Sequence, residues 1–324
     1  MNISPKRLAT LGLAFILSAC GSVMRDGQRQ QSTSVVDRMY VIQCGENHAA
    51  DLSSWTTAAD KGKAHVFGNH CYLIRHRSGW LLWDSGNADR IATMPNGLVN
   101  PRGTLTAFMR KPLAESLKEI GVAPENIAHF AMSHSHGDHS GNANLFFRST
   151  IYMQTAEYNA IYGPEPQKLG ITPANFENLR DARIVKLNGD HDVFGDGSVV
   201  IKSTPGHTPG HQSLFVRLPK TGPVLLSGDF VHLKSNWKAK RVPSINYSVE
   251  QSSRSMNEMD SFIKTTGAQL WINHDAEQSR AIPKRRPLLN SACPTDDTVT
   301  PNPLLERTVK SRLRLLSPAA QRQR

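Results

Sequence analysis

The stretch Ser133-His134-Ser135-His136-Gly137-Asp138-His139 decides what fold and chemistry to expect from this chain. Four metal-binding side chains fall within six positions: His134, His136, Asp138 and His139. The apolar run 127–132 before them has the length of a strand, and loop-forming residues follow. In a loop that leaves a strand, the first two side chains can point to one side and the last two to the other. The spacing therefore predicts two pairs of ligands for two metal ions.

Each metal needs further ligands, because zinc usually has four and a catalytic site leaves one position to water. Three apolar strands downstream each run into a residue that can bind metal: His207, Asp229 and His274. Separate strand ends that each deliver one ligand are expected when an active site lies along one edge of a sheet. One such residue alone would more often be a turn residue, but four segments in one chain predict a metal site.

These segments resemble the metallo-β-lactamase superfamily, and within it the N-acyl homoserine lactonases, from about Met39 to about Ile282. The H-x-H-x-D-H element is typical of the whole superfamily. Residues 204–215 and 273–278 are more specific, since they read like lactonase segments. Trp83-Asp84-Ser85-Gly86 matches the superfamily's early D-[ST]-G turn, whose aspartate supports the ligands. The resemblance implies an α/β fold, the αββα sandwich, and a hydrolase that opens the lactone ring of quorum-sensing signals.

By the same resemblance, the ligands divide into two sets. One metal is assigned to His134, His136 and His207, the other to Asp138, His139 and His274, with Asp229 as the bridge. His211 is assigned to buried hydrogen bonding instead. We expect two divalent ions, with zinc as the expected metal, although such ligands also suit iron, manganese or cobalt. A hydroxide bridging the metals would attack the lactone carbonyl, and Asp138 would carry the proton to the leaving oxygen.

One position departs from the lactonase pattern. Three residues after Asp229, familiar lactonases carry a tyrosine whose hydroxyl polarises the substrate carbonyl or the leaving oxygen, and this chain has His232. An imidazole N–H can donate a similar hydrogen bond. We therefore predict Asp138 and His232 as the catalytic residues of a lactonase, with the exchange bearing on its efficiency and substrate range.

Three other functions stay open at this point. The same metals and hydroxide would serve a hydrolase of this fold that acts on another ester, a thioester, a phosphotriester or a β-lactam. An oxygen-reducing flavodiiron protein shares the fold, but it typically has a carboxylate where His136 stands and also carries a flavin domain, and the sequence has neither. A metal-binding lipoprotein without turnover is the third, and the complete ligand set argues against it.

A lipoprotein signal is predicted at residues 1–20. Lys6-Arg7 and a short apolar run precede Leu17-Ser18-Ala19-Cys20, and the run is too short to span a membrane. The mature chain should therefore begin at a lipid-modified Cys20, with an ordinary cleaved signal as the alternative. Gly21 rather than aspartate after the cysteine favours the outer membrane, with the enzyme facing the periplasm.

The rest of the chain divides into a flexible polar tether at 21–37, the hydrolase domain at 38–283, and a basic tail at 284–324 that we expect to be disordered. The net charge of +11 could suggest nucleic acid, but the tail holds nine basic and three acidic residues, a net +6. We therefore expect no nucleic-acid partner, with anionic lipid headgroups as a lesser alternative for the tail.

Local patterns predict two helices and leave the cysteines open. One helix should run from Pro112 to a stop at Gly121, and another should carry Met256 and Met259 as core residues before Gly267. With Cys20 set aside, three cysteines remain: Cys44, Cys71 and Cys293. One disulfide is possible in an oxidising compartment, but the sequence does not give its pairing.

Overall fold

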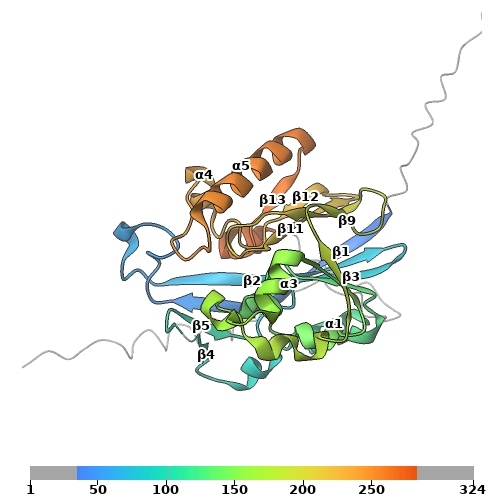
Figure 1. Cartoon of the computed structure of the whole chain (residues 1–324), viewed down its shortest axis with the longest axis horizontal. Helices are drawn as coiled ribbons and strands as arrows, with labels where there is room; N and C mark the ends of the chain where they lie inside the picture. The colour runs from blue at the N-terminus through green and yellow to red at the C-terminus, as the bar shows by residue number, and fades with distance from the viewer. Residues whose placement is uncertain (1–34, 101, 283–324) are drawn as a thin grey trace, which may run out of the picture. The chain divides into compact units, whose positions relative to one another are not determined.

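The structure is a computed structural model that describes residues 35–100 and 102–282. The predicted lipoprotein signal and basic tail lie outside the described residues, as do most of the tether and Cys293. Two β-sheets pack face to face with helices on both outer sides, and Figure 1 shows α4 and α5 over one sheet and α1 over the other. The predicted αββα sandwich is confirmed.

The first sheet has eight strands in the order β4-β5-β1-β2-β3-β6-β7-β8. Its strands are β1 (Val36–Ala49), β2 (His65–His76), β3 (Gly79–Trp83), β4 (Leu98–Val99), β5 (Leu105–Phe108), β6 (His129–Ala131), β7 (Thr150–Gln154) and β8 (Arg183–Leu187). From β4 through β3 all neighbours pair antiparallel, whereas β3, β6, β7 and β8 pair parallel. The parallel half therefore sends its strand ends, and the loops after them, to one edge.

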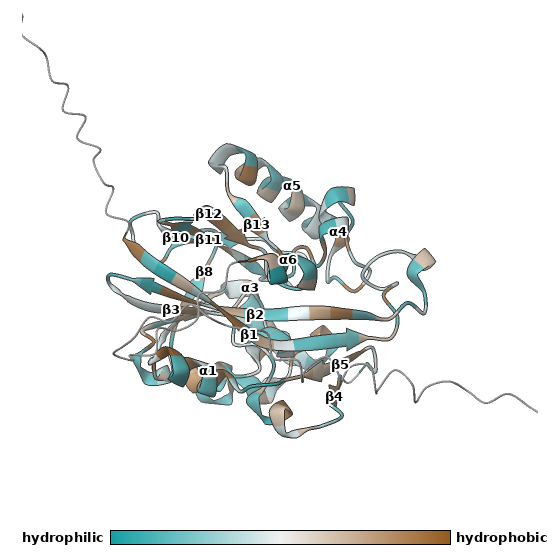
Figure 2. Cartoon of the chain, turned by 180° about the vertical axis from the view of Figure 1, so that it is seen from behind, coloured by the Kyte–Doolittle hydropathy of each residue, from teal (hydrophilic) through white to brown (hydrophobic). Residues whose placement is uncertain are grey.

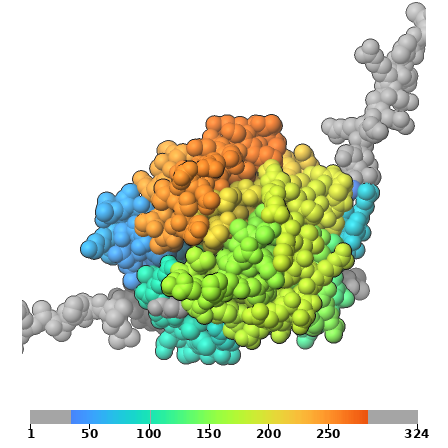
Figure 3. All heavy atoms as spheres, viewed as in Figure 1, coloured from blue at the N-terminus to red at the C-terminus, as the bar shows by residue number. Residues whose placement is uncertain are grey.

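The second sheet has five strands in the order β13-β12-β11-β10-β9. Its strands are β9 (His191–Asp192), β10 (Val199–Ser203), β11 (Gln212–Leu218), β12 (Gly222–Leu226) and β13 (Gln269–Trp271). Only β12 and β13 pair parallel within it. In the space-filling view of Figure 3, the orange segment that contains α5 borders the yellow-green part of the chain.

The described residues also form α-helices, and α1, α4 and α5 among them cover the outer faces of the sheets. The α-helices are α1 (Leu113–Ile120), α2 (Gly137–Ser140), α3 (Thr155–Tyr162), α4 (Lys234–Ala239), α5 (Val249–Thr266) and α6 (Ala276–Ala281). Short 3-10 helices are η1 (Ala58–Asp60), η2 (Asp89–Thr93), η3 (Pro124–Asn126), η4 (Ala143–Phe146), η5 (Pro166–Leu169) and η6 (Pro173–Leu179). Both predicted helices are confirmed, and Gly121 and Gly267 end them in the left-handed conformation that glycine adopts without strain. None of the helices in the described part is long and apolar enough to cross a membrane.

The continuous apolar run of β3 is explained by burial of both faces of its sheet. Leu81 and Trp83 pack between the two sheets, whereas Leu82 packs on the other side, toward α1. On the far side of the second sheet, Met256 and Met259 of α5 join a separate core cluster, as predicted. Figure 2 shows hydrophobic and hydrophilic residues alternating along α1 and α5, which each bury one face only.

The disulfide joins Cys44 to Cys71 on the neighbouring strands β1 and β2. Both cysteines are buried. Their meeting depends on the register of the two strands, which is shifted by an irregularity between Gln43 and Glu46. Register is a tertiary property, and this is why the sequence left the pairing open.

Candidate metal centre

Four predicted ligands follow β6: His134 and His136 lie in the loop before α2, and Asp138 and His139 lie within α2. Of these, His134 and His139 are buried, and His136 and Asp138 are partly exposed. Asp84, directly after β3, holds this loop from behind. Its carboxylate accepts a hydrogen bond from the Ser133 N–H at 2.6 Å and lies 3.0 Å from Nδ1 of His139. Asp84 thus occupies the supporting place that the D-S-G turn predicted.

The other three predicted ligands come from separate strand ends. His207 follows β10, Asp229 follows β12, and His274 follows β13. These strands belong to the second sheet, whereas β6 belongs to the first. The predicted ligands therefore meet where the edges of the two sheets come together.

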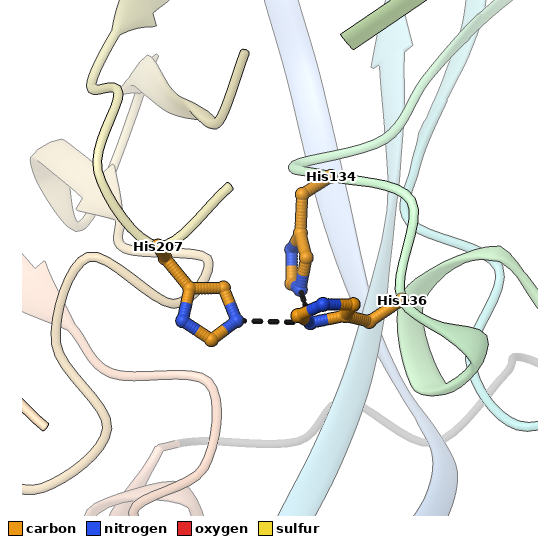
Figure 4. A group of neighbouring side chains, drawn as sticks. All are labelled: His134, His136 and His207. Carbon is orange, nitrogen blue, oxygen red and sulfur yellow. Dashed lines mark hydrogen bonds between the residues drawn. The ribbon is translucent and has the colours of Figure 1, made fainter. Parts of the chain in front are cut away.

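The first set of ligands turns its ring nitrogens toward one point, as Figure 4 shows for His134, His136 and His207. The Nδ1 atom of His136 lies 2.9 Å from Nε2 of His134 and 3.0 Å from Nε2 of His207. The outer nitrogens of His136 and His207 lie 3.0 Å from acceptors, the Leu169 carbonyl and Asn246 Oδ1. Those outer nitrogens carry the hydrogens, so the inner ones present lone pairs. Converging buried lone pairs fit a cation between them.

Burial also keeps the first set neutral. It holds the pKa of His134 and of His207 well below the ordinary histidine value, because a charged ring would lose its hydration. A histidine binds metal through the lone pair of its neutral ring. The two side chains are therefore prepared for a cation across the physiological pH range.

The second set consists of Asp138, His139 and His274. The carboxylate Oδ2 of Asp138 lies 3.8 Å from Nε2 of His139 and 3.6 Å from Nε2 of His274, and the two nitrogens are 3.2 Å apart. Burial alone lowers the pKa of His139, but neighbouring carboxylates, Asp229 foremost, raise it well above its ordinary value. The second set therefore favours a positive charge at its centre, and a divalent cation supplies one.

Asp229 faces both sets. Its Oδ1 atom lies 3.2 Å from Nε2 of His139 and 3.1 Å from Nε2 of His274. Its Oδ2 atom lies 3.4 Å from Nε2 of His207 and 3.9 Å from Nε2 of His134. Oδ1 is buried and receives no hydrogen bond within residues 35–100 and 102–282. Oδ2 also lies 3.2 Å from Nε2 of His274. A carboxylate that lies between nitrogens of both sets can bridge two cations, as the resemblance implied.

His211 lies behind the ligands. Its Nε2 atom accepts a hydrogen bond from the Asp229 N–H at 2.8 Å, and its Nδ1 atom lies 2.9 Å from the Thr204 hydroxyl. Burial lowers its pKa to about 3, so the ring stays neutral and able to accept. The structure thus gives His211 the buried hydrogen-bonding place expected for it.

His232 lies closer to the ligands than the sequence indicated. Its Nε2 atom is 3.1 Å from Oδ2 of Asp229, and its ring stacks on His274 with centroids 5.6 Å apart. Its Nδ1 atom is buried without a hydrogen-bond partner among the described residues. His207, Asp229 and His232 also have the spacing of a metal-binding group. The ring therefore lies within the cluster of predicted ligands itself.

Three buried side chains, Asn47, Asn69 and Glu157, support the predicted ligands, and no sequence motif marks them. Asn47 donates to Oδ2 of Asp138 at 2.7 Å, and Asn69 donates to the Asp138 backbone carbonyl at 2.7 Å. These partners are 91 and 69 positions apart in sequence. Glu157 accepts hydrogen bonds from two of the ligand loops. Sequence reasoning missed all three because no local spacing connects them to a ligand.

We expect purified protein to contain close to two metal equivalents per chain. His207→Ala should retain about one, because the first set loses one of its three imidazoles while the second set is untouched. Elemental analysis after exhaustive dialysis measures both values. His191→Ala changes a histidine outside the centre and should keep two equivalents. A wild-type value that stays at one would contradict the dinuclear arrangement.

A model of the metallo-β-lactamase superfamily matches residues 65–264. The chain is 32% identical over 215 residues to the N-acyl homoserine lactonase AttM of Azorhizobium caulinodans, a match that covers 64% of this chain and 81% of that protein. It is 30% identical over 257 residues to an N-acyl homoserine lactonase of a Bacillus species, covering 76% and 96%.

Solved structures agree with these relatives. An N-acyl homoserine lactone hydrolase with the product N-hexanoyl-L-homoserine bound at its catalytic metal centre superposes with a TM-score of 0.68 at 28% identity. Bacillus thuringiensis AiiA with bound N-decanoyl-L-homoserine gives the same TM-score and identity. Each match covers 77% of this chain and 98% of the other. Since the family model spans more than half of the chain, the chain belongs to the metallo-β-lactamase superfamily.

Proposed function

We propose that this protein is a dinuclear metal-dependent hydrolase that opens the lactone ring of N-acyl homoserine lactones. The observation that carries the proposal is Asp229, whose carboxylate lies between two sets of metal-binding side chains and contacts nitrogens of both. The identity of about 30% to N-acyl homoserine lactonases supports the substrate class. Zinc is the expected metal, because a set of histidines and carboxylates at neutral pH suits it well.

Two side chains of this protein would act on the substrate. When bound, the cations lower the pKa of a water molecule so that hydroxide is available at neutral pH. Hydrolysis would add the oxygen of water to the lactone carbonyl carbon and break the ring C–O bond, which gives an N-acyl homoserine. Asp138, whose carboxylate accepts a hydrogen bond from Asn47, would carry the proton of that water to the leaving oxygen. His232 donates an N–H hydrogen bond to the carbonyl or the leaving oxygen.

The substrate class is tested with a panel. Purified enzyme should hydrolyse N-acyl homoserine lactones of several chain lengths in preference to nitrocefin, a thioester and a phosphotriester. His207→Ala, which should lose a metal, gives the background rate. Turnover of a β-lactam, thioester or phosphotriester without any lactone opening would overturn the lactonase proposal and leave the hydrolase class. A protein that binds two metals and turns over none of the panel would support a non-catalytic role.

We also propose that a lipid on Cys20 tethers the enzyme to a bacterial membrane, where it faces the periplasm. The outer membrane is the expected location. The support is the Leu17-Ser18-Ala19-Cys20 box behind a basic and apolar leader. The buried disulfide between Cys44 and Cys71 suits an oxidising compartment outside the cytosol.

Labelled palmitate should therefore be incorporated into the wild-type protein and not into Cys20→Ser. The variant lacks the thiol that accepts lipid, and it should shift from the membrane fraction to soluble or uncleaved material. Gel autoradiography and fractionation measure the two effects. Equal labelling of both proteins, or no label in either with the protein free in the periplasm, would argue for an ordinary signal.

A further inference from the structure

One buried carboxylate connects the two loops that carry the first set of ligands. Glu157, in the first turn of α3, is only 1% exposed. Its Oε1 atom accepts hydrogen bonds from the N–H and the hydroxyl of Ser135, at 2.8 and 2.5 Å. Its Oε2 atom accepts from the Thr208 hydroxyl and the Gly210 N–H, at 2.8 and 2.9 Å. Each oxygen therefore serves one loop.

The two loops are those that present the three converging histidines. Ser135 stands between His134 and His136, and Thr208 directly follows His207. Across the gap between the loops, Nδ1 of His136 lies 3.0 Å from Nε2 of His207, and within the first loop it lies 2.9 Å from Nε2 of His134 (Figure 4). A change in the spacing of the loops would therefore change the metal position directly.

The loop after β10 is built to lie against Glu157. A Cβ atom at Gly210 would come within 2.3 Å of the Glu157 backbone nitrogen, so only glycine allows this approach. Within the described part of the chain, Glu157 forms no salt bridge with a lysine, arginine or histidine. A buried carboxylate without such a partner is costly unless hydrogen bonds and a nearby cation offset its lost hydration. Four donors supply the hydrogen bonds, and a metal in the first set would supply the cation.

Asp84 provides a comparison on the other side of the centre. It accepts from the Ser133 N–H and lies 3.0 Å from Nδ1 of His139, a ligand of the second set. Asp84 thus contacts a ligand of the second set directly and reaches His134 of the first set only through the Ser133 hydroxyl, whereas Glu157 connects the two loops of the first set. The superfamily's early turn marks Asp84 in the sequence, whereas nothing in the sequence marks Glu157.

We propose that Glu157 is a positioning residue that fixes the spacing of the two ligand loops and thereby sets the affinity of the first metal position. Its negative charge also offsets the charge of the cation held there. The inference rests on the metal centre of the proposed function and not on the identity of the substrate. Residues in this position behind metal ligands typically contribute 10- to 100-fold to metal affinity.

The variant Glu157→Gln tests this with little change in shape. The amide keeps one oxygen for the Ser135 donors but presents an NH₂ group to the Gly210 N–H, so the second loop loses its acceptor. We expect one zinc equivalent to dissociate at about 10- to 100-fold lower chelator concentration than in the wild type, with the second unchanged. Full-length, zinc-loaded protein is dialysed against graded chelator, and the retained zinc is measured by elemental analysis.

The matched control lies in the same helix. Thr155→Ala removes a hydroxyl that donates to the Leu187 carbonyl in β8 and touches neither ligand loop. It should retain zinc like the wild type, even if its unfolding temperature falls slightly. If Glu157→Gln does not fold, Ser135→Ala and Thr208→Val each remove one donor to Glu157, from the first and the second loop respectively. Each should then weaken one zinc equivalent only.

The outcomes separate this inference from the proposed function. If Glu157→Gln retains zinc as the wild type does, the positioning role is wrong. If Glu157→Gln does not fold, the same conclusion follows when Ser135→Ala and Thr208→Val both retain zinc as the wild type does. If Thr155→Ala loses zinc to the same extent, the effect is general to α3 and the inference is also wrong. A wild-type protein that binds two zinc ions and opens no lactone would contradict the proposed function alone. A wild-type protein that binds fewer than two zinc ions would contradict both the proposed function and the positioning role of Glu157.

Discussion

Replacing Asp138 with asparagine should lower kcat for lactone opening by about 10²- to 10⁴-fold, the usual contribution of a positioned acid or base. An amide can still accept the hydrogen bond from Asn47 and can still offer an oxygen to a metal, but it cannot carry a proton. The Asp138 side chain is 21% exposed, against 5% for Asp229, so of the two carboxylates it is better placed to reach a substrate. Steady-state kinetics with elemental analysis of the same sample measures the effect.

The metal content of Asp138→Asn separates the loss of a proton carrier from the loss of a metal ion. We expect Asp138→Asn to keep at least the metal of the first set, whose ligands it does not touch. Asp181→Asn, an exposed aspartate, serves as a control and should be unchanged in both rate and metal content. An Asp138→Asn enzyme with wild-type kcat would show that another group carries the proton.

Replacing His232 with alanine should lower kcat by about 100- to 1,000-fold, the loss seen when one donor to a developing oxyanion is removed. Its Nε2 atom lies 3.1 Å from Oδ2 of Asp229, so the ring lies beside the proposed metal centre, where the lactone would be hydrolysed. The seven predicted ligands remain in His232→Ala, so both metals should stay bound. Kinetics and elemental analysis on the same preparation measure the two properties.

His232→Tyr distinguishes a donor from a ligand. A tyrosine hydroxyl can donate the same hydrogen bond, so this variant should retain substantial lactonase activity and two metals. Loss of one metal equivalent in His232→Ala would instead identify His232 as a ligand, a role that its distance from Asp229 and His207 also permits. The predicted catalytic role would then be wrong.

The sequence by itself determined the predicted ligands and the type of fold. Metal-binding residues at strand ends are encoded locally, by an apolar run followed within a few residues by His or Asp. This pattern repeats before His134, His207, Asp229 and His274. The helix bounded by Gly121 was equally local, because a glycine in the left-handed conformation ends a helix without help from distant residues. The resemblance of these segments to one superfamily supplied the αββα sandwich, and the order of the strands came only from the structure.

The tertiary structure alone decided which distant residues support the ligands. The pairing of Cys44 with Cys71 depends on the register between two strands, and the contact of Asn47 with Asp138 spans 91 positions. Glu157 reaches two loops only because α3 packs beneath them at the junction of the sheets. Such contacts result from how the layers pack, and packing is set by many weak interactions at once, so no short motif in the sequence records it.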